Sequence, residues 1–436
     1  MVWQSPIFVI LCFALFSASH VHAGGLNEVK IHGFLSQGYL WSDLNNYLAE
    51  STQGSAEFNE VGLTTSISPC DRLRLGLQLL SRDLGDEGNN VAFLDWGYAD
   101  YRWHDELGFR IGKIKNPVGL YNKSRDLDML RQSVLLPQGV YGESTRQFIL
   151  AINGLGLYGY KSVSFLGDFE YEFQVGSRNI PDINTEFWDS QYKEVGVRIA
   201  SEIEQTMTQT PLYPPGSINV AYSETSDRVV YASNTVLGSL IWAPPVKGVR
   251  VAGVYLLTSD INASGKNEVL LSIASSTPGF PSPASTLVIP MQSFVNVHAY
   301  TASAEYSNGG LLLAAEYLRN NWDIEVRTVS TDKTSHSSEG YYGSASFQVS
   351  PWLAFGGYYS EFYPDRTDRE GKKQVHAAAG WQKDIAVNTR FDITPYWISK
   401  LEFHIYDGFA LVAEPEGEDT RARNWVLLAL KNTFHF

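Results

Sequence analysis

The sequence predicts an all-β protein, a transmembrane antiparallel β-barrel of about 16 strands, with 18 as the alternative count. Three observations lead to this fold class. Apolar and polar residues alternate along the chain with a period of two, which is the period of a β-strand. Short turns alternate with long polar connections. The chain ends in an alternating segment whose last residue is Phe436.

Composition excludes several other classes of protein. Mean hydropathy is −0.16, too low for a bundle of membrane helices, and 13% of the 436 residues are aromatic, which suits a barrel with aromatic girdles. The formal net charge of −14 argues against a nucleic-acid partner. The two cysteines are Cys12, near the N-terminus, and Cys70. Cys70 alone can form neither an internal disulfide nor a thiolate metal cluster.

The N-terminus predicts a secretory signal peptide. Residues 7–16, IFVILCFALF, form an apolar run that is short for a membrane span. Val21 and Ala23 occupy the small-residue positions of a signal-peptidase site, so we expect residues 1–23 to be removed. The alternative is an uncleaved anchor. Residues 24–436 are then expected to form a single barrel domain.

The clearest strand is the segment 72–82, RLRLGLQLLSR. Its two faces differ in polarity, with Leu73, Leu75, Leu77 and Leu79 on one face and Arg72, Arg74, Gly76, Gln78 and Arg82 on the other. The segment 168–176, DFEYEFQVG, repeats the pattern. In a membrane barrel the apolar face meets lipid and the polar face lines the lumen. A soluble β-sandwich or lipocalin also alternates, but it does not need this many strands.

The connections between the predicted strands alternate in length. Tight turns are expected at 68–71, 103–106, 243–248, 307–310, 350–352 and 394–397. Longer polar segments occupy 42–55, 115–145, 260–293, 320–337, 363–374 and 408–423. Short turns at one end and long loops at the other are typical of a transmembrane barrel. The pattern is interrupted within residues 190–230.

The C-terminal strand and the aromatic residues complete the prediction. The side chains that alternate back from the terminus are Phe436, Phe434, Asn432, Leu430, Leu428 and Val426. This ending resembles the assembly signal of Gram-negative outer-membrane proteins, which implies recognition by the barrel assembly machinery; the alternative is the buried last strand of a soluble barrel. Aromatic residues near strand ends are expected to form interfacial girdles: Tyr39, Trp41, Trp96, Trp103, Trp352, Trp397 and Trp425.

Over essentially the whole chain after residue 23, the pattern resembles the bacterial outer-membrane porin superfamily. The most similar part is 107–145, LGFRIGKIKNPVGLYNKSRDLDMLRQSVLLPQGVYGEST, in which a strand leads into a long segment. Its KNPVGLYNKSRD stretch is similar to porins of the phosphate and dicarboxylate type. The resemblance implies an inward-folded constriction loop at 115–145. It also implies a homotrimer in the outer membrane of a Gram-negative bacterium, in contact with membrane lipid and lipopolysaccharide.

The resemblance implies a water-filled channel for passive diffusion of small hydrophilic solutes and ions, whose selectivity depends on charges at the constriction. The candidate pore-lining residues are Arg72, Arg74, Arg82, Arg110, Lys115, Arg125, Asp126, Asp128 and Arg131. Asp126 and Asp128 would face Arg74 and Arg110 across the pore. In the alternative interpretation, Arg72 and Arg82 are charges at the rim, and Asp126 and Arg125 pair locally within the loop.

Two other functions are compatible with the sequence. One is a substrate-specific channel with a binding site for phosphate, dicarboxylate or sugar, and the other is a non-channel barrel acting in surface adhesion. An enzyme is not expected, because the histidines are scattered and neither an H-E-x-x-H nor a G-x-S-x-G motif occurs. We therefore expect no catalytic residue, cofactor or metal.

Overall fold

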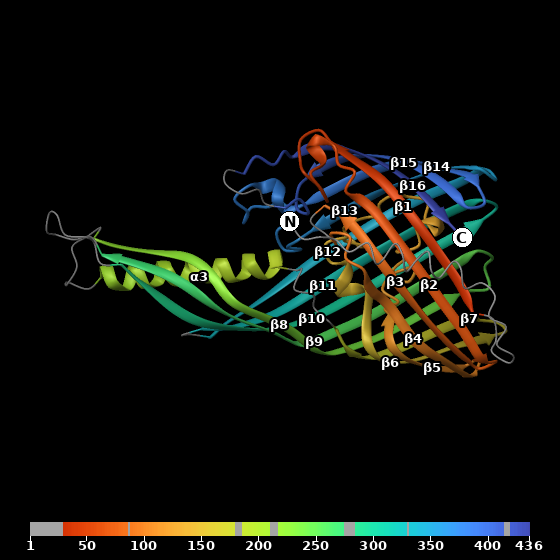
Figure 1. The fold of residues 1–436 in the computed structure, drawn as a ribbon, viewed down its shortest axis with the longest axis horizontal. Helices are drawn as coiled ribbons and strands as arrows, with labels where there is room; N and C mark the ends of the chain where they lie inside the picture. The colour runs from red at the N-terminus through yellow and green to blue at the C-terminus, as the bar shows by residue number, and fades with distance from the viewer. Residues whose placement is uncertain are drawn as a thin grey trace.

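The structure is a computed structural model that describes residues 29–85, 88–178, 185–209, 217–273, 284–328, 331–413 and 419–436. The expected signal peptide and most of the acidic segment at 414–419 lie outside the described residues. Within them, sixteen antiparallel strands form one closed barrel, in which each strand pairs with its neighbours in sequence and β1 pairs with β16 (Figure 1). The predicted fold class and strand number are confirmed.

The strands are β1 (Lys30–Ser42), β2 (Phe58–Cys70), β3 (Leu73–Leu84), β4 (Phe93–His104), β5 (Leu107–Lys115), β6 (Ala151–Val163), β7 (Gly167–Ser177), β8 (Ile218–Ala243), β9 (Val249–Ile273), β10 (Ala284–Asn308), β11 (Leu311–Arg327), β12 (Thr331–Ser350), β13 (Leu353–Tyr363), β14 (Gln382–Thr394), β15 (Trp397–Gly408) and β16 (Asn424–His435). The helical segments are η1 (Ser51–Gln53), η2 (Asp128–Leu130), α2 (Arg146–Leu150), α3 (Thr185–Thr208) and η3 (Ala377–Gly380).

The two faces of each strand have opposite environments, as the alternation predicts. On β3 the outward Leu77 is 38% exposed, whereas the neighbouring inward Gln78 is 1% exposed. On β16 the outward Leu430 is 39% exposed and the inward Lys431 is 1% exposed. Large apolar side chains that stay exposed all around a closed barrel are what a lipid-facing surface requires.

Short turns lie at the end of the barrel where β1 begins and β16 ends, and most long connections lie at the other end. The predicted tight turns are present between these strands. The predicted polar loops at 260–293 and 320–337 are wrong, because most of these residues continue β9, β10, β11 and β12. Their polar side chains signal strands that extend beyond the apolar band rather than loops.

The three strands β8, β9 and β10 are the longest and extend well past the rest of the barrel at the long-loop end, with α3 lying along them (Figure 1). Buried Ile199 and Ala200 of α3 pack against Ile218, Val269 and Ile289 of these strands. This apolar layer lets the extension hold its shape outside the barrel. Among the described residues, no helix is long and apolar enough to cross a membrane.

The predicted aromatic girdle is correct only in part. Trp103 and Trp352, beside the short turns, face outward and are 51% and 55% exposed. Trp96 and Trp425 instead face the lumen, because they pair in register with the inward Gln78 and Tyr406. The Trp96 indole N–H donates to the Gln78 side chain (2.7 Å), and the Trp425 ring stacks on Tyr406 with ring centres 3.9 Å apart.

The lipid-facing surface gives a first prediction. Leu401 faces outward near the middle of β15, opposite Leu430 of β16. Leu401→Arg should lower the free energy of unfolding by about 2–4 kcal/mol, the cost of a cation at mid-membrane depth. Reversible denaturation of protein folded into lipid vesicles measures this cost. Val246→Arg, in the exposed turn between β8 and β9, is the matched control and should cost about 0–1 kcal/mol; equal costs would contradict the assignment of the two positions.

Candidate functional site

The connection between β5 and β6, residues 116–150, lies inside the barrel and reaches the opposite wall. We call it the luminal loop. It contains η2 and α2. The carboxylate of Glu402, on β15, accepts the backbone N–H groups of Val134 (3.0 Å) and Leu135 (2.8 Å). The Arg390 guanidinium, on β14, donates to the carbonyl oxygens of Met129 (2.8 Å) and Arg131 (2.9 Å). The luminal loop is thus fixed through its backbone to the far wall.

Asp128 is the centre of the strongest anchor of the luminal loop. Its carboxylate lies 3.0 Å from Lys400 Nζ, 3.6 Å from Lys431 Nζ and 3.2 Å from the Arg131 guanidinium. Thr433 Oγ1 also donates to it (2.7 Å). Burial alone would raise the pKa of Asp128, but the cations, Lys400 first, hold it below its ordinary value. The carboxylate therefore stays ionised, and each buried charge has a partner.

A second set of ion pairs fixes the two ends of the luminal loop to β3, β4 and β5. Asp126 pairs with Lys115 and accepts a hydrogen bond from the Gln78 amide (2.7 Å). Glu143 pairs with Arg82 (2.8 Å) and Arg125 (3.0 Å). Burial would raise the pKa of Glu143, but Arg125 and then Arg82 lower it below the ordinary value.

Arg146, at the start of α2, pairs with Asp95 of β4 (3.0 Å), and both side chains are buried. The loop is thus held at its entry, at its far tip and at its exit.

The structure places the predicted site residues in three groups. Six of them belong to the ion pairs of the luminal loop: Arg82, Lys115, Arg125, Asp126, Asp128 and Arg131. Arg110 lies apart from them, paired with Asp100 and Glu172 at 3.0 Å each. Arg74 lies near the short turns, where its guanidinium reaches Ser66 Oγ (3.5 Å), and Arg72 is exposed in the turn between β2 and β3.

The two loop carboxylates lie in ion pairs, whereas the prediction had them face two arginines across the pore. Asp126 and Asp128 meet lysines and Arg131, not Arg74 or Arg110. Three partners of Asp128, namely Lys400, Lys431 and Thr433, are far from it in sequence. The spacing of residues along the chain does not show that they lie close together in the fold.

Sequence reasoning missed the inward charges of β14, β15 and β16. The buried His404 ring lies 3.0 Å from Asp384 and 3.1 Å from Glu402, next to the Lys400 and Glu402 that hold the luminal loop. The signal was present in the strand 400–406, KLEFHIY, where Lys400, Glu402 and His404 alternate with apolar residues. Three charged or polar residues on the inward face of one strand indicate a charged partner inside the barrel.

Inward side chains are buried on every strand, and several of them pack against the luminal loop. Each strand has at least one inward side chain that is no more than 6% exposed: Leu40, Phe58, Gln78, Asp95, Ile114, Ile152, Gln174, Leu237, Leu256, Thr301, Glu316, Tyr342, Tyr358, Asn388, Glu402 and Ala429. On one side, Val134 and Leu135 pack with Tyr47, in the β1–β2 connection, and with Phe409 and Val412, in the β15–β16 connection. On the other side, Val118 packs against Leu237 and Leu256.

Some polar groups of the strands and of the luminal loop stay exposed. Arg74 is exposed on the short-turn side, and the side chain of Lys123, which pairs with Glu172, is 45% exposed. Ser144 and Thr145 are exposed near the other end of the loop. A cavity of about 70 Å³ is lined by the loop residues Leu130 and Gln132 and by residues of β11–β14. The described residues contain no group of three or more His, Cys, Asp or Glu that could hold a metal ion.

The Asp128 anchor gives a second prediction. Asp128→Asn leaves Lys400 and Lys431 buried beside a neutral group and should lower the free energy of unfolding by about 3–5 kcal/mol. Lys123→Gln breaks a half-exposed pair and should cost about 0–1 kcal/mol. Denaturant titration in lipid vesicles compares the two. A loss for Asp128→Asn no larger than that for Lys123→Gln would show that the anchor does not stabilise the barrel.

The lowered pKa values of Asp128 and Glu143 give a third prediction. Their stabilising effect is complete above the ordinary carboxylate pKa of about 4 and is lost only as pH falls through the lower values of the folded protein. The luminal loop should therefore keep its protection from hydrogen exchange between pH 7 and about pH 4, after correction for the intrinsic exchange rate. Loss of protection at residues 116–150 above pH 4 would contradict the ion-pair geometry.

Comparison with known proteins identifies the fold. No family model matches the chain, and no curated protein matches it in sequence. Solved structures do match. OmpF of Salmonella typhi, in a complex with daunomycin, is 11% identical with a TM-score of 0.53, over 95% of this chain and 99% of that one. An anion-selective porin from Comamonas acidovorans is 10% identical with a TM-score of 0.52, over 94% of this chain and 99% of that one.

At these identities the likeness concerns the fold. It extends over nearly the whole length of both chains, so it includes the complete barrel rather than a few shared strands. This chain therefore has the fold of the bacterial outer-membrane porins.

Proposed function

We propose that this protein is an outer-membrane channel for small hydrophilic solutes and ions, with a low conductance set by the luminal loop, residues 116–150. The observation that carries the proposal is the inverted polarity of the closed barrel: apolar side chains are exposed outside, and ionised groups lie inside. A lumen that carries charged groups suits the passage of water, ions and hydrophilic solutes, because lumen charges tune selectivity in barrels of this kind.

The loop sets the size of the passage. Since the inward side chains are buried at its level, a solute passes only through a narrow space beside the loop or when loop side chains move. The 70 Å³ cavity beside Gln132 and Tyr342 is one place where such a space can widen. A narrow, charged passage favours small ions and solutes over the broad traffic of a wide pore.

The setting of the channel is part of the same proposal. We infer export by a signal peptide cleaved after residue 23, insertion by the barrel assembly machinery through the strand ending at Phe436, and a homotrimer in the outer membrane of a Gram-negative bacterium. The N-terminal residue of the purified protein tests the cleavage. Electrophoretic mobility with and without heating tests the folded barrel and its assembly.

The first experiment is single-channel recording of the purified protein in a planar lipid bilayer. We expect stepwise openings smaller than those of OmpF recorded in the same salt. Glu402→Gln weakens the acceptor of the Val134 and Leu135 N–H groups and should make larger openings more frequent, because the loop is held less firmly. Thr389→Val, an outward change on the neighbouring strand, should leave the openings unchanged. If neither the folded wild-type protein nor folded Glu402→Gln produces openings, the channel proposal is overturned.

The charges of the luminal loop give a prediction about selectivity. Asp126→Asn combined with Asp128→Asn leaves Lys115 and Lys400 without their carboxylates, whereas Lys431 keeps Glu60 (2.5 Å). The reversal potential in a salt gradient should then shift toward anions, since uncompensated cations attract them. Asp71→Asn combined with Asp105→Asn, an equal charge change in two exposed turns, is the control. An unchanged reversal potential in the double variant would exclude these carboxylates from the passage.

A second function is favoured by a specific observation. The burial of inward side chains on every strand and the extension of β8, β9 and β10 beyond the barrel also suit a barrel that acts at the cell surface without conducting. Bilayer recording separates the two functions, because a surface barrel stays silent even when Glu402→Gln loosens the loop.

A further inference from the structure

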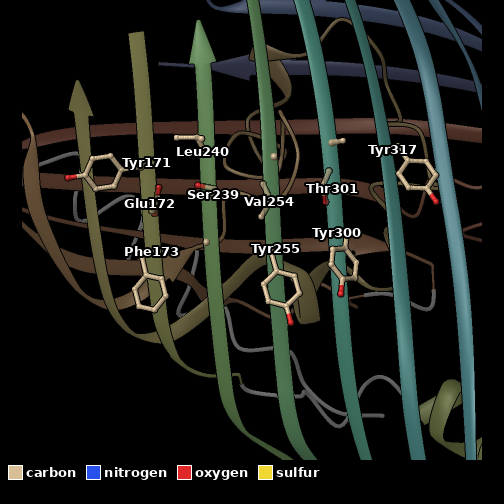
Figure 2. A pocket seen from close by; sticks show the side chains of 13 residues that line it. Tyr171, Glu172, Phe173, Ser239, Leu240, Val254, Tyr255, Tyr300, Thr301 and Tyr317 are labelled. Carbon is tan, nitrogen blue, oxygen red and sulfur yellow. The ribbon is translucent and has the colours of Figure 1, made fainter. Parts of the chain in front are cut away.

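The inward face of β15 carries a buried histidine, His404. Every strand of the barrel places successive side chains on opposite faces. Figure 2 shows this on β10, where the exposed outward ring of Tyr300 precedes the buried Thr301. On β15 the same alternation places Glu402 and His404 inside the barrel, and neither side chain has any exposed surface. Two ionisable groups are therefore enclosed together, at the wall that the luminal loop reaches.

Glu402 is the acceptor that holds the tip of the luminal loop, and its contacts leave no position for a proton. Its Oε1 accepts the Leu135 N–H (2.8 Å) and lies 3.1 Å from His404 Nε2. Its Oε2 accepts the Val134 N–H (3.0 Å) and the Asn388 amide (3.1 Å). Each oxygen thus has two donors, as suits an ionised carboxylate. A negative charge is therefore fixed inside the barrel.

The other nitrogen of the His404 ring faces a second carboxylate. Nδ1 lies 3.0 and 3.1 Å from the two oxygens of Asp384, on β14. Since each ring nitrogen faces a carboxylate, each has to carry a hydrogen, and the ring is then an imidazolium. Among the described residues, the ion pairs of Asp384 and Glu402 are with His404 alone. The ring is thus a single cation between two buried anions.

Aromatic side chains enclose these three charged groups. The Tyr406 ring is nearly parallel to the His404 ring, with 5.5 Å between the ring centres, and the Tyr358 ring meets it edge-on at 6.0 Å. Trp425 stacks on Tyr406 in turn. Charges interact strongly where water is excluded, and an unpaired charge is costly there. Loss of the charge on the ring would therefore leave the two carboxylates in an unfavourable position.

We propose that His404 is a positioning residue for the luminal loop: its imidazolium joins Asp384 to Glu402 and keeps Glu402 directed at the backbone of the loop tip. Without the charge on the ring, the two carboxylates repel each other, Glu402 turns away from the loop, and the passage beside the tip widens. The consequence for the passage rests on the proposed channel, whereas the position of the loop can be measured in a barrel that conducts nothing.

The first test detects the charge of the ring. The full chain is labelled with nitrogen-15 histidine and folded in detergent, and nuclear magnetic resonance shows whether both ring nitrogens carry a hydrogen. The measurement is made at about pH 8, where a histidine with the ordinary pKa of about 6.5 is neutral. Asp384→Asn identifies the His404 signal, because it changes the partner of Nδ1. We expect an imidazolium in the wild type, and a neutral His404 ring would overturn the proposal.

The second test measures hydrogen exchange at the loop tip, residues 132–138. His404→Gln leaves two buried carboxylates without a cation and should speed exchange there about a hundredfold. Asp384→Asn is the matched comparison, because it keeps the imidazolium beside Glu402, and it should exchange like the wild type. The combined variant removes one charge of each sign and keeps the net charge of the wild type, so it should recover most of the protection.

Unchanged exchange in His404→Gln would contradict the proposal. So would an equal loss of protection in His404→Gln and in the combined variant, because the ring would then act through its shape rather than its charge. The measurement of the ring charge needs only the wild type and Asp384→Asn, and it decides the matter if His404→Gln does not fold. Neither test needs an open channel, so silent bilayers would overturn the channel proposal and not this one.

Discussion

The structure depends on one constraint: a chain that crosses lipid as strands must satisfy every backbone hydrogen bond within itself. Closure of sixteen strands through the pairing of β1 with β16 meets it, since no strand keeps an open edge in the apolar band. Closure then fixes the rest. With a period of two, every second side chain faces lipid and every other one faces the lumen, and the lumen becomes a compartment in which charges must find partners.

The luminal loop answers that second requirement. Its carboxylates and the cations of β3, β5, β15 and β16 neutralise one another in a space with little water. Such pairs contribute little net stability over an apolar filling, but each is costly to break from one side. They therefore specify where the loop sits more than how stable the barrel is. The charges of the lumen therefore determine the position of the loop, and with it the free space beside the loop.

The sequence predicted the barrel because that information is local. Leu73, Leu75 and Leu77 against Arg74 and Gln78 show the period of two without any knowledge of neighbours, and the short turns are visible as local patterns. The sequence also indicated the long segment after Lys115.

The partners of that segment were not local. Asp128 meets Lys400 and Thr433, more than 270 positions away, and single-sequence patterns carry no such distance. Polar residues at 260–293 were misread because the outward face of the extended strands is polar rather than apolar, which removes the contrast that marks a strand in lipid; the other face packs in apolar clusters. The helix α3 was missed although Ile199, Ile203 and Met207 recur every four residues.

The seam between β1 and β16 also orders events in time. Phe34 pairs with His435. One edge of β1 pairs with β2, and the other edge stays unpaired until β16 is in place. Contacts of such sequence separation form late, because the entropy of closing the intervening chain must be overcome first. Lys431 and Thr433 arrive with that same strand. The contacts of Asp128 with β16 can therefore form only in the step that completes the wall around the luminal loop.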